Sequence, residues 1–102
     1  MEKFTLYLGL NDKDTKQQKI DTIEAYKLCS NLLADTIGAG TISTAQGIYK
    51  HENGAIVIEN TLRIEIIEAA ADMVMNLCDT LKRLFIQESI LLQRDTISNM
   101  FV

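Results

Sequence analysis

The chain has 102 residues, of which 47% are hydrophobic and 24% are charged, proportions typical of a globular domain. Its net charge of −4 argues against a protein that binds the phosphate backbone of nucleic acids, because such binding needs clustered Lys and Arg. No run of about 18 apolar residues is present, so we expect no membrane-spanning helix. The first residues lack the pattern of a signal peptide, which predicts a cytoplasmic protein.

The first predicted element is a strand that covers residues 4–8. Apolar side chains alternate there with Thr5 and Tyr7, which is the period of a strand with one buried face. We therefore expect Thr5 and Tyr7 to face away from the core. The side chains expected to face the core are Phe4, Leu6 and Leu8. Residues 11–18 are polar and predict a loop.

A helix is predicted to begin at Asp21. Asp21 and Glu24 have the spacing of a capping box, in which each side chain bonds a backbone N–H of the first turn. Apolar residues then recur at helical spacing and predict one stripe that packs on the core. This stripe comprises Ile23, Tyr26, Cys29, Leu33 and Ile37. We expect the helix to end at Gly38-Ala39-Gly40, because glycine tolerates the left-handed conformation that terminates helices.

Two strands are predicted next, over residues 41–51 and 55–67. Asn53-Gly54 lies between them and is the strongest short signal for a β-hairpin. If these two residues form the tight turn, Tyr49 pairs with Ile58 on the face that carries the helices. The alternation of side chains then determines which residues of both strands face the open side of the sheet.

In this register the open face carries polar pairs and some apolar side chains. Gln46 would lie opposite Thr61, Thr44 opposite Arg63, and Ile42 opposite Glu65. Asn60 is an exception, because its polar amide would point towards the helices, where it needs hydrogen-bond partners. Either Asn60 caps a helix end or a bulge, or the register is shifted by one residue.

A second helix is predicted by apolar residues at the spacing i, i+3, i+4, i+7, i+10 and i+11. They are Val74, Leu77, Cys78, Leu81, Leu84 and Phe85. Asp72 in the first turn and Lys82-Arg83 in the last turn have the signs that the helix dipole favours. Residues 89–94 predict the final strand, and residues 98–102 form an apolar tail.

The predicted order of elements is strand–helix–strand–strand–helix–strand. Each helix has one apolar stripe, so both can pack on one face of a four-stranded antiparallel sheet. Right-handed crossovers would then give the strand order 4-1-3-2. We therefore predict an α+β fold, a ferredoxin-like βαββαβ sandwich, that forms a single domain over residues 1–102.

No residue pattern predicts a catalytic or metal site, so we expect no cofactor. Cys29 and Cys78 lie on the predicted apolar stripes, and we interpret them as small buried residues rather than a redox pair or a nucleophile. His51 is the single histidine and is interpreted as an exposed residue beside the turn. Residues 11–14 lack the glycine and the distal glutamate of an EF-hand calcium loop.

The open face of the sheet is the surface where we expect binding. The candidate binding residues are Tyr7, Gln46, Thr61, Arg63 and Glu65. An RNA-recognition domain would use this face, but it needs aromatic residues on both central strands and basic surroundings. One alternative is a solvated face held by cross-strand pairs. The other is a face covered by a partner, which exposed Ile42, Ile48 and Val57 and the apolar tail favour.

Four segments of the chain resemble a group of small uncharacterised proteins of bacteria and their phages. They are residues 5–14, 47–54, 59–65 and 87–90. The resemblance implies a bacterial or phage origin and brings no assigned activity. The chain lacks the arginine-containing glycine loop of acylphosphatases and the C-x-x-C motif of metal-carrier domains after its first strand.

We predict a non-enzymatic protein-binding or assembly module, and in particular a homo-oligomer that uses the open sheet face or the C-terminal tail. The partner would be a second copy or another protein, with no direct nucleic-acid or membrane contact. One alternative is a small acidic inhibitor of phage type that binds a basic host protein. The other is a small-molecule enzyme or sensor that uses Tyr7, Arg63 and Glu65 on the open face.

Overall fold

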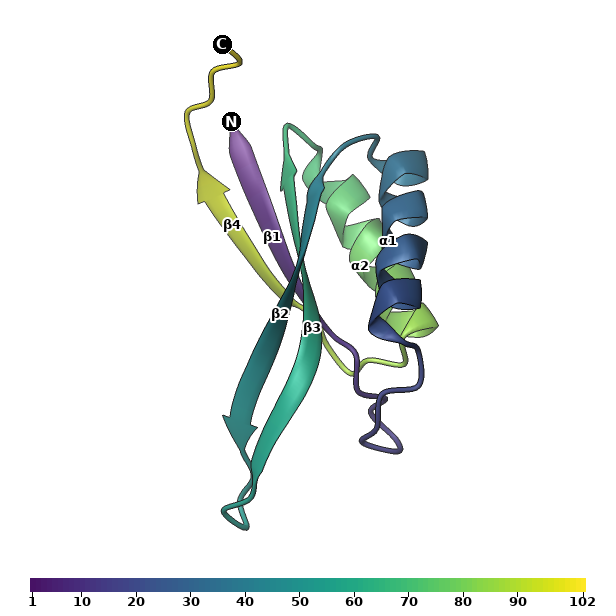
Figure 1. Ribbon diagram of the computed structural model, residues 1–102. Helices are drawn as coiled ribbons and strands as arrows, with labels where there is room; N and C mark the ends of the chain where they lie inside the picture. Colours follow the sequence, from purple (N-terminus) through teal and green to yellow (C-terminus); the bar gives the residue numbers. More distant parts are fainter.

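A computed structural model that describes residues 1–102 shows one antiparallel sheet with two helices on one of its faces (Figure 1). The elements are β1 (Glu2–Gly9), α1 (Thr22–Thr36), β2 (Thr41–Lys50), β3 (Ile56–Ile67), α2 (Ala71–Leu84) and β4 (Leu91–Thr96). The strand order β2-β3-β1-β4 is the predicted order read from the other edge. The predicted ferredoxin-like α+β fold is therefore confirmed. Neither helix is long and apolar enough to cross a membrane.

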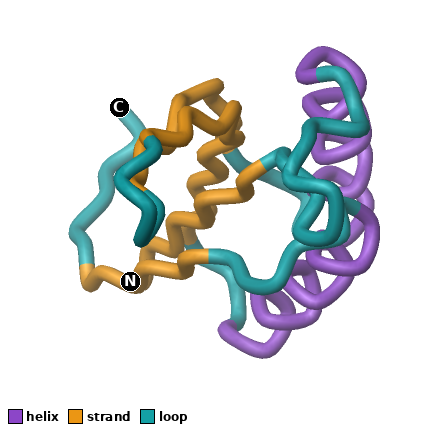
Figure 2. Tube along the Cα trace, turned by 90° about the horizontal axis from the view of Figure 1, so that it is seen from below, coloured by secondary structure: helices purple, strands orange, loops and turns teal.

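The core lies between the sheet and the two helices, and the opposite face of the sheet is uncovered (Figure 2). The predicted core residues of β1 are buried, and alternate residues of β3 join them. From the strands the core receives Phe4, Leu6, Leu8, Leu62, Ile64 and Ile66. From α2 and its end it receives Val74, Leu77, Cys78, Leu81 and Phe85, as predicted, whereas Leu84 is exposed.

The buried stripe of α1 differs from the predicted one. Ala25, Cys29 and Leu33 are buried. Ile23 is 65% exposed and Tyr26 is 43% exposed. The helix therefore turns a small alanine towards the core and leaves two larger apolar side chains largely outside it. Predictions based on side-chain size favour the larger apolar residues, and here they were wrong at these two positions.

The start of α1 is held by Gln18 rather than by the predicted capping box. The Asp21 side chain makes no capping hydrogen bond. Instead the Gln18 amide donates to the hydroxyl of Thr22 at 3.0 Å, and its Oε1 accepts a bond of 2.8 Å from Asn60. Asn60 thus finds its partner in the loop before α1. At the other end Gly38 has a φ of +98° and donates to the Leu33 carbonyl, so the helix ends there as predicted.

The β2–β3 hairpin is closed by three residues, Glu52-Asn53-Gly54, and not by two. The His51 N–H donates to the Ala55 carbonyl at 2.8 Å, and the Gly54 N–H donates to the His51 carbonyl at 2.9 Å. Gly54 has a φ of +88°, as expected for the left-handed residue that ends a three-residue hairpin turn. The predicted two-residue turn was wrong because Asn-Gly is compatible with both lengths.

The extra turn residue shifts the register by one position and exchanges the faces of β2. Gln46 lies opposite Asn60 and therefore faces the helix side of the sheet, so its predicted place on the open face was wrong. Ile48 faces the helix side for the same reason, opposite Ile58. Tyr49, which was predicted on the helix side, lies instead on the open face opposite Val57.

The open-face positions of β1 and of the inner part of β3 agree with the prediction, because their alternation is independent of the turn. Tyr7 lies opposite Arg63, and Thr5 lies opposite Glu65, in the centre of the sheet. The outer ends of β2 and β3 project beyond the helices as a two-stranded arm (Figure 1). On the helix-side face of this arm Ile48, Ile56 and Ile58 are 71%, 70% and 59% exposed.

The boundary between the projecting arm and the part of the sheet that the helices cover can be tested with two substitutions on one face of β3. Leu62→Ala removes a fully buried side chain, and we expect it to lower the free energy of unfolding by about 2–5 kcal/mol. Ile58→Ala changes an exposed side chain four positions earlier, and we expect a loss below about 1 kcal/mol. Urea unfolding followed by circular dichroism measures both. Equal losses would contradict the described arm.

Candidate functional site

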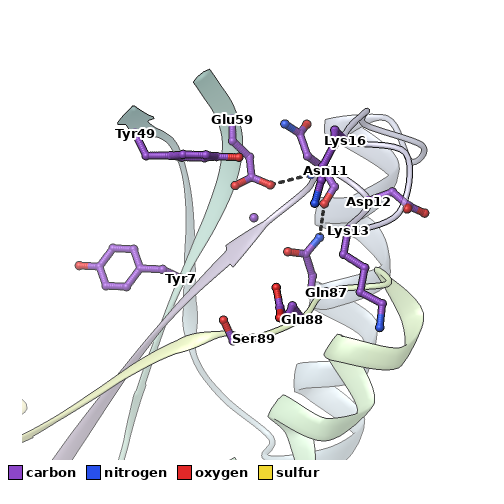
Figure 3. Close-up of a pocket in the computed structure, with 11 residues that line it drawn as sticks. Tyr7, Asn11, Asp12, Lys13, Lys16, Tyr49, Glu59, Gln87, Glu88 and Ser89 are labelled. Carbon is purple, nitrogen blue, oxygen red and sulfur yellow. Dashed lines mark hydrogen bonds between the residues drawn. The ribbon is translucent and has the colours of Figure 1, made fainter. Parts of the chain in front are cut away.

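A cavity of about 300 Å³ opens on the uncovered face of the sheet, where β1 runs into the following loop (Figure 3). Its walls come from β1, β2, β3 and the loop that precedes β4. The residues that matter for its chemistry are Tyr7, Gly9, Tyr49, Glu59, Gln87 and Ser89. Lys13 and Lys16 of the loop after β1 also line it.

Glu59 is held in place at this cavity by two features of β1 and its extension. Pairing between β1 and β3 ends at Gly9 and Thr61, so Glu59 lies just past the last pair and folds back over β1. One carboxylate oxygen accepts a hydrogen bond of 2.8 Å from the Asn11 N–H. A β-carbon at Gly9 would lie 2.6 Å from three atoms of the Glu59 carboxyl group, so glycine leaves the space that the carboxyl group occupies.

Gln87, from the segment between α2 and β4, holds the other side of the Asn11 residue. Its side-chain amide donates to the Asn11 carbonyl at 2.6 Å and to the Phe85 carbonyl at 3.2 Å. Figure 3 shows Gln87 and Glu59 approaching Asn11 from opposite sides. The Asn11 backbone is thus bonded through its N–H to β3 and through its carbonyl to the end of α2.

The loop that carries Lys13 and Lys16 is closed around Asp12. The buried Asp12 carboxylate accepts hydrogen bonds from the N–H groups of Thr15 at 3.0 Å and Asp14 at 2.7 Å. These bonds hold the pKa of Asp12 below its usual value, and the bond from the Thr15 N–H has the largest effect. Asp12 therefore organises the loop through backbone donors. No three Asp, Glu, His or Cys side chains in the chain lie close enough to share a metal ion.

Two tyrosines complete the cavity. Tyr7 projects from β1, whereas the ring of Tyr49 extends towards Glu59 (Figure 3). The Tyr49 ring also packs edge-on against exposed His51, with ring centroids 5.4 Å apart. A fixed carboxylate beside the Tyr49 ring attracts a cationic ligand, because the charge of the carboxylate and the negative face of the ring act in the same direction. The Tyr7 ring points away from Glu59 (Figure 3). Lys13 and Lys16 provide positive charge at another part of the same wall.

The five residues predicted for the open face occupy different places. Tyr7 lines the cavity. Thr61 is buried, and its hydroxyl donates to the Glu59 carbonyl at 3.1 Å. Arg63 and Glu65 form an ion pair with each other outside the cavity, and Lys3 lies 3.6 Å from the same carboxylate group. The buried Nε of Arg63 has no hydrogen-bond partner. Gln46 lies on the opposite face of the sheet.

Tyr49 was missed as a site residue because the predicted register placed it on the helix side. Glu59 was predicted on the open face, opposite Ile48, but was not chosen as a binding residue, because its contacts with Gly9 and Asn11 were not visible in the sequence.

The length of the turn at Asn53-Gly54, two residues or three, decides which face Tyr49 occupies, so a correct turn length would have placed it. In the predicted register the Asn60 amide had no partner, which already suggested a register shifted by one residue. The structure shows this shift.

The cysteines are structural. Cys29 and Cys78 are both buried, as predicted. Burial raises the pKa of the Cys29 thiol to about 12. Burial, and then the nearby Asp79 carboxylate, also raise the pKa of Cys78. Neither side chain forms the thiolate that nucleophilic or redox chemistry needs at neutral pH.

The hydrogen bonds to Asp12 predict a pH-dependent contribution to stability. Because its pKa is lower in the folded chain, the ionised form stabilises the fold above about pH 4, and this stabilisation disappears as the pH falls through the folded pKa. We therefore expect Asp12→Asn to unfold at lower urea concentration than the unmodified chain at pH 7, and the difference to shrink near pH 3. Asp14→Asn is the control, because the Asp14 carboxylate accepts no hydrogen bond. A difference for Asp12→Asn that is independent of pH would contradict this role.

Comparisons with known proteins identify the fold but no family. No family model and no curated protein sequence matches the chain. Among solved structures, a phage SAM lyase in complex with S-methyl-5′-thioadenosine is similar, with a TM-score of 0.67 and 19% identity over 92% of this chain and 79% of that one. The apo state of a phage SAM lyase gives 0.65 and 17%, over 92% and 78%. A variant of CutA1 from Pyrococcus horikoshii gives 0.59 and 14%, over 99% and 87%.

Proposed function

We propose that this chain binds SAM (S-adenosylmethionine) in the cavity beside Glu59 and cleaves it to S-methyl-5′-thioadenosine. The observation that carries the proposal is the Glu59 carboxylate, fixed by the Asn11 N–H at a cavity that two tyrosines also line. The shared fold with the phage SAM lyase supports it. The proposal develops one of the predicted alternatives, a small-molecule enzyme on the open face, with Glu59 and Tyr49 in place of Arg63 and Glu65.

The ligand's charges match those of the cavity. The sulfonium sulfur of SAM is positive, so a carboxylate and an aromatic ring favour it over a neutral thioether. The methionine part carries a carboxylate, for which Lys13 and Lys16 on the cavity wall are suitable partners. A volume of about 300 Å³ lies at the lower end of the range for small-molecule sites, and the open mouth leaves room for the adenosine group.

The cleavage needs no cofactor, because the positively charged sulfur departs readily as a neutral thioether. When the bond between sulfur and the amino-acid chain breaks, its electron pair stays on sulfur, which becomes a neutral thioether. The carbon that loses sulfur must gain an electron pair from the ligand's own carboxylate or from a neighbouring C–H bond whose proton goes to a base. Two carboxylates at the cavity are held by hydrogen bonds, and that of Asp12 is engaged by the N–H groups of its own loop. Glu59 is therefore the carboxylate that orients the sulfonium or accepts that proton.

Binding of SAM can be tested by isothermal titration calorimetry, and its cleavage by chromatography of S-methyl-5′-thioadenosine. We expect the unmodified chain to bind and cleave SAM. Glu59→Gln should weaken binding about tenfold or more, because it removes a charge next to the sulfonium, where an ion pair contributes about 1–4 kcal/mol.

Glu65→Gln is the matched control, because Glu65 lies on the same strand and face but outside the cavity. It should leave binding and cleavage unchanged. Absence of SAM binding by the unmodified chain, or equal effects of the two substitutions, would overturn the proposal. Circular dichroism verifies that both variants fold.

We also propose that the projecting arm joins copies of this chain, through its helix-side face rather than through the open sheet face or the C-terminal tail that were predicted. Ile48, Ile56 and Ile58 form an exposed apolar group on one face of the arm, beyond the cover of the helices. Such a group is normally covered by a partner surface. The predicted inhibitor of a basic host protein stays a prediction, since no contact within the chain bears on it.

Sedimentation velocity tests this assembly. We expect the unmodified chain to sediment as an oligomer and Ile58→Lys to sediment as a monomer, because a buried lysine in the contact would lack a partner. Ile23→Lys is the control, because Ile23 is equally exposed but lies on α1. A monomeric unmodified chain at high concentration would contradict the proposal.

A further inference from the structure

The backbone conformation at position 9 does not require the glycine that is found there. The left-handed glycines of the chain are Gly38 and Gly54, and Gly9 is not among them. A glycine inside a strand weakens the strand, because it has no side chain to pack and loses more freedom on folding than other residues. The reason for glycine at this position is therefore space, and the space is occupied by the carboxyl group of Glu59.

The contact at Gly9 is tight but involves only the far end of a flexible side chain. The three atoms nearest to a β-carbon there would be Cδ, Oε1 and Oε2 of Glu59, each at 2.6 Å. Alanine at this position can thus be accommodated if the Glu59 carboxyl group moves away. That movement would break the 2.8 Å hydrogen bond between Glu59 and the Asn11 N–H.

Gln87 supports the same arrangement from the other side. Its amide bonds the carbonyls of Asn11 and Phe85, and so ties the extension of β1 to the end of α2. Gln87 is separated by 76 positions from Asn11 in the sequence, so this tie is a tertiary contact rather than a local turn. Gln87 adds to two backbone hydrogen bonds that hold the same segment, from the Leu10 N–H to the Asn60 carbonyl at 2.9 Å and from the Lys13 N–H to the Ile86 carbonyl at 3.0 Å.

We propose that Gly9 and Gln87 are positioning residues that set the Glu59 carboxylate in place before a ligand arrives. This rests on the proposed function as far as SAM is concerned, but the geometry concerns the ligand-free chain. A carboxylate that is already ordered spares the ligand the free-energy cost of ordering it, so affinity depends on residues that themselves supply no charge. Gly9 gives the carboxylate its space, and Gln87, through its bond to the Asn11 carbonyl, strengthens the hold on the backbone donor that fixes it.

The first experiment observes the arrangement without any ligand. The amide proton of Asn11 reports its hydrogen bond to the carboxylate in a ¹H–¹⁵N NMR spectrum. We expect Gly9→Ala, Gln87→Ala and Glu59→Ala each to move this signal upfield, towards the position of an unbonded amide. Gly47→Ala is the matched control, because Gly47 lies on the same face and its β-carbon would meet nothing closer than 3.4 Å. An unmoved Asn11 signal in Gly9→Ala would overturn the inference.

The second experiment is a double-mutant cycle between Gly9→Ala and Glu59→Ala, read by SAM affinity and by urea unfolding. We expect Gly9→Ala to weaken binding about tenfold in the unmodified chain and to have no further effect once Glu59 is removed, because it acts through Glu59. In the Glu59→Ala background Gly9→Ala should also raise stability, because alanine suits a strand better than glycine and no carboxyl group obstructs it.

The two proposals fail in different ways. If the unmodified chain binds no SAM while the Asn11 signal and the stability cycle respond as expected, the proposed function is wrong and the positioning role holds. If SAM binds but Gly9→Ala changes affinity equally with and without Glu59, the positioning role is wrong and the proposed function holds.

Discussion

The left-handed conformation of Gly54 is the constraint on which the functional face of this protein depends. It closes a three-residue turn, and the turn sets the register of β2 against β3. Because side chains alternate along a strand, the register decides which residues of β2 face the open side of the sheet. It places Tyr49 there, close to Glu59, and turns Gln46 to the helix side. A backbone angle at the tip of the hairpin thus determines the composition of a cavity at its base.

Hydrophobic periodicity was sufficient to predict the architecture. The helical spacing from Val74 to Phe85 and the alternation of Phe4, Leu6 and Leu8 report burial directly, and burial dominates the free energy of folding. The same rule was wrong at Ile23 and Tyr26, because the face of α1 that is turned to the core carries the small Ala25 while these two larger residues are exposed. The strand order followed from the handedness of crossovers, which needs no knowledge of particular side chains.

The candidate site was predictable only in part, because its contacts join distant segments. Tyr7 could be placed on the open face from the alternation of β1 alone. The hydrogen bond between Asn11 and Glu59 spans 48 positions in the sequence, and no local sequence pattern predicts it. Gly9 gave no signal as part of a turn, and its role emerges only when the carboxyl group of Glu59 is seen beside it. Arg63 and Glu65 were predicted to bind a ligand but form an ion pair with each other.

Because of the projecting arm, the walls of the cavity differ in rigidity. Two-stranded ribbons have little stability of their own, whereas β1 is paired on both sides in the centre of the sheet. Backbone amides of the arm should therefore exchange with solvent through local opening, while those of β1 exchange only on global unfolding. Tyr49 belongs to the opening part and Tyr7 to the protected part. Fraying of one hairpin would thus move one wall of the open cavity while the other wall stays fixed, which requires neither a hinge between domains nor a separate lid.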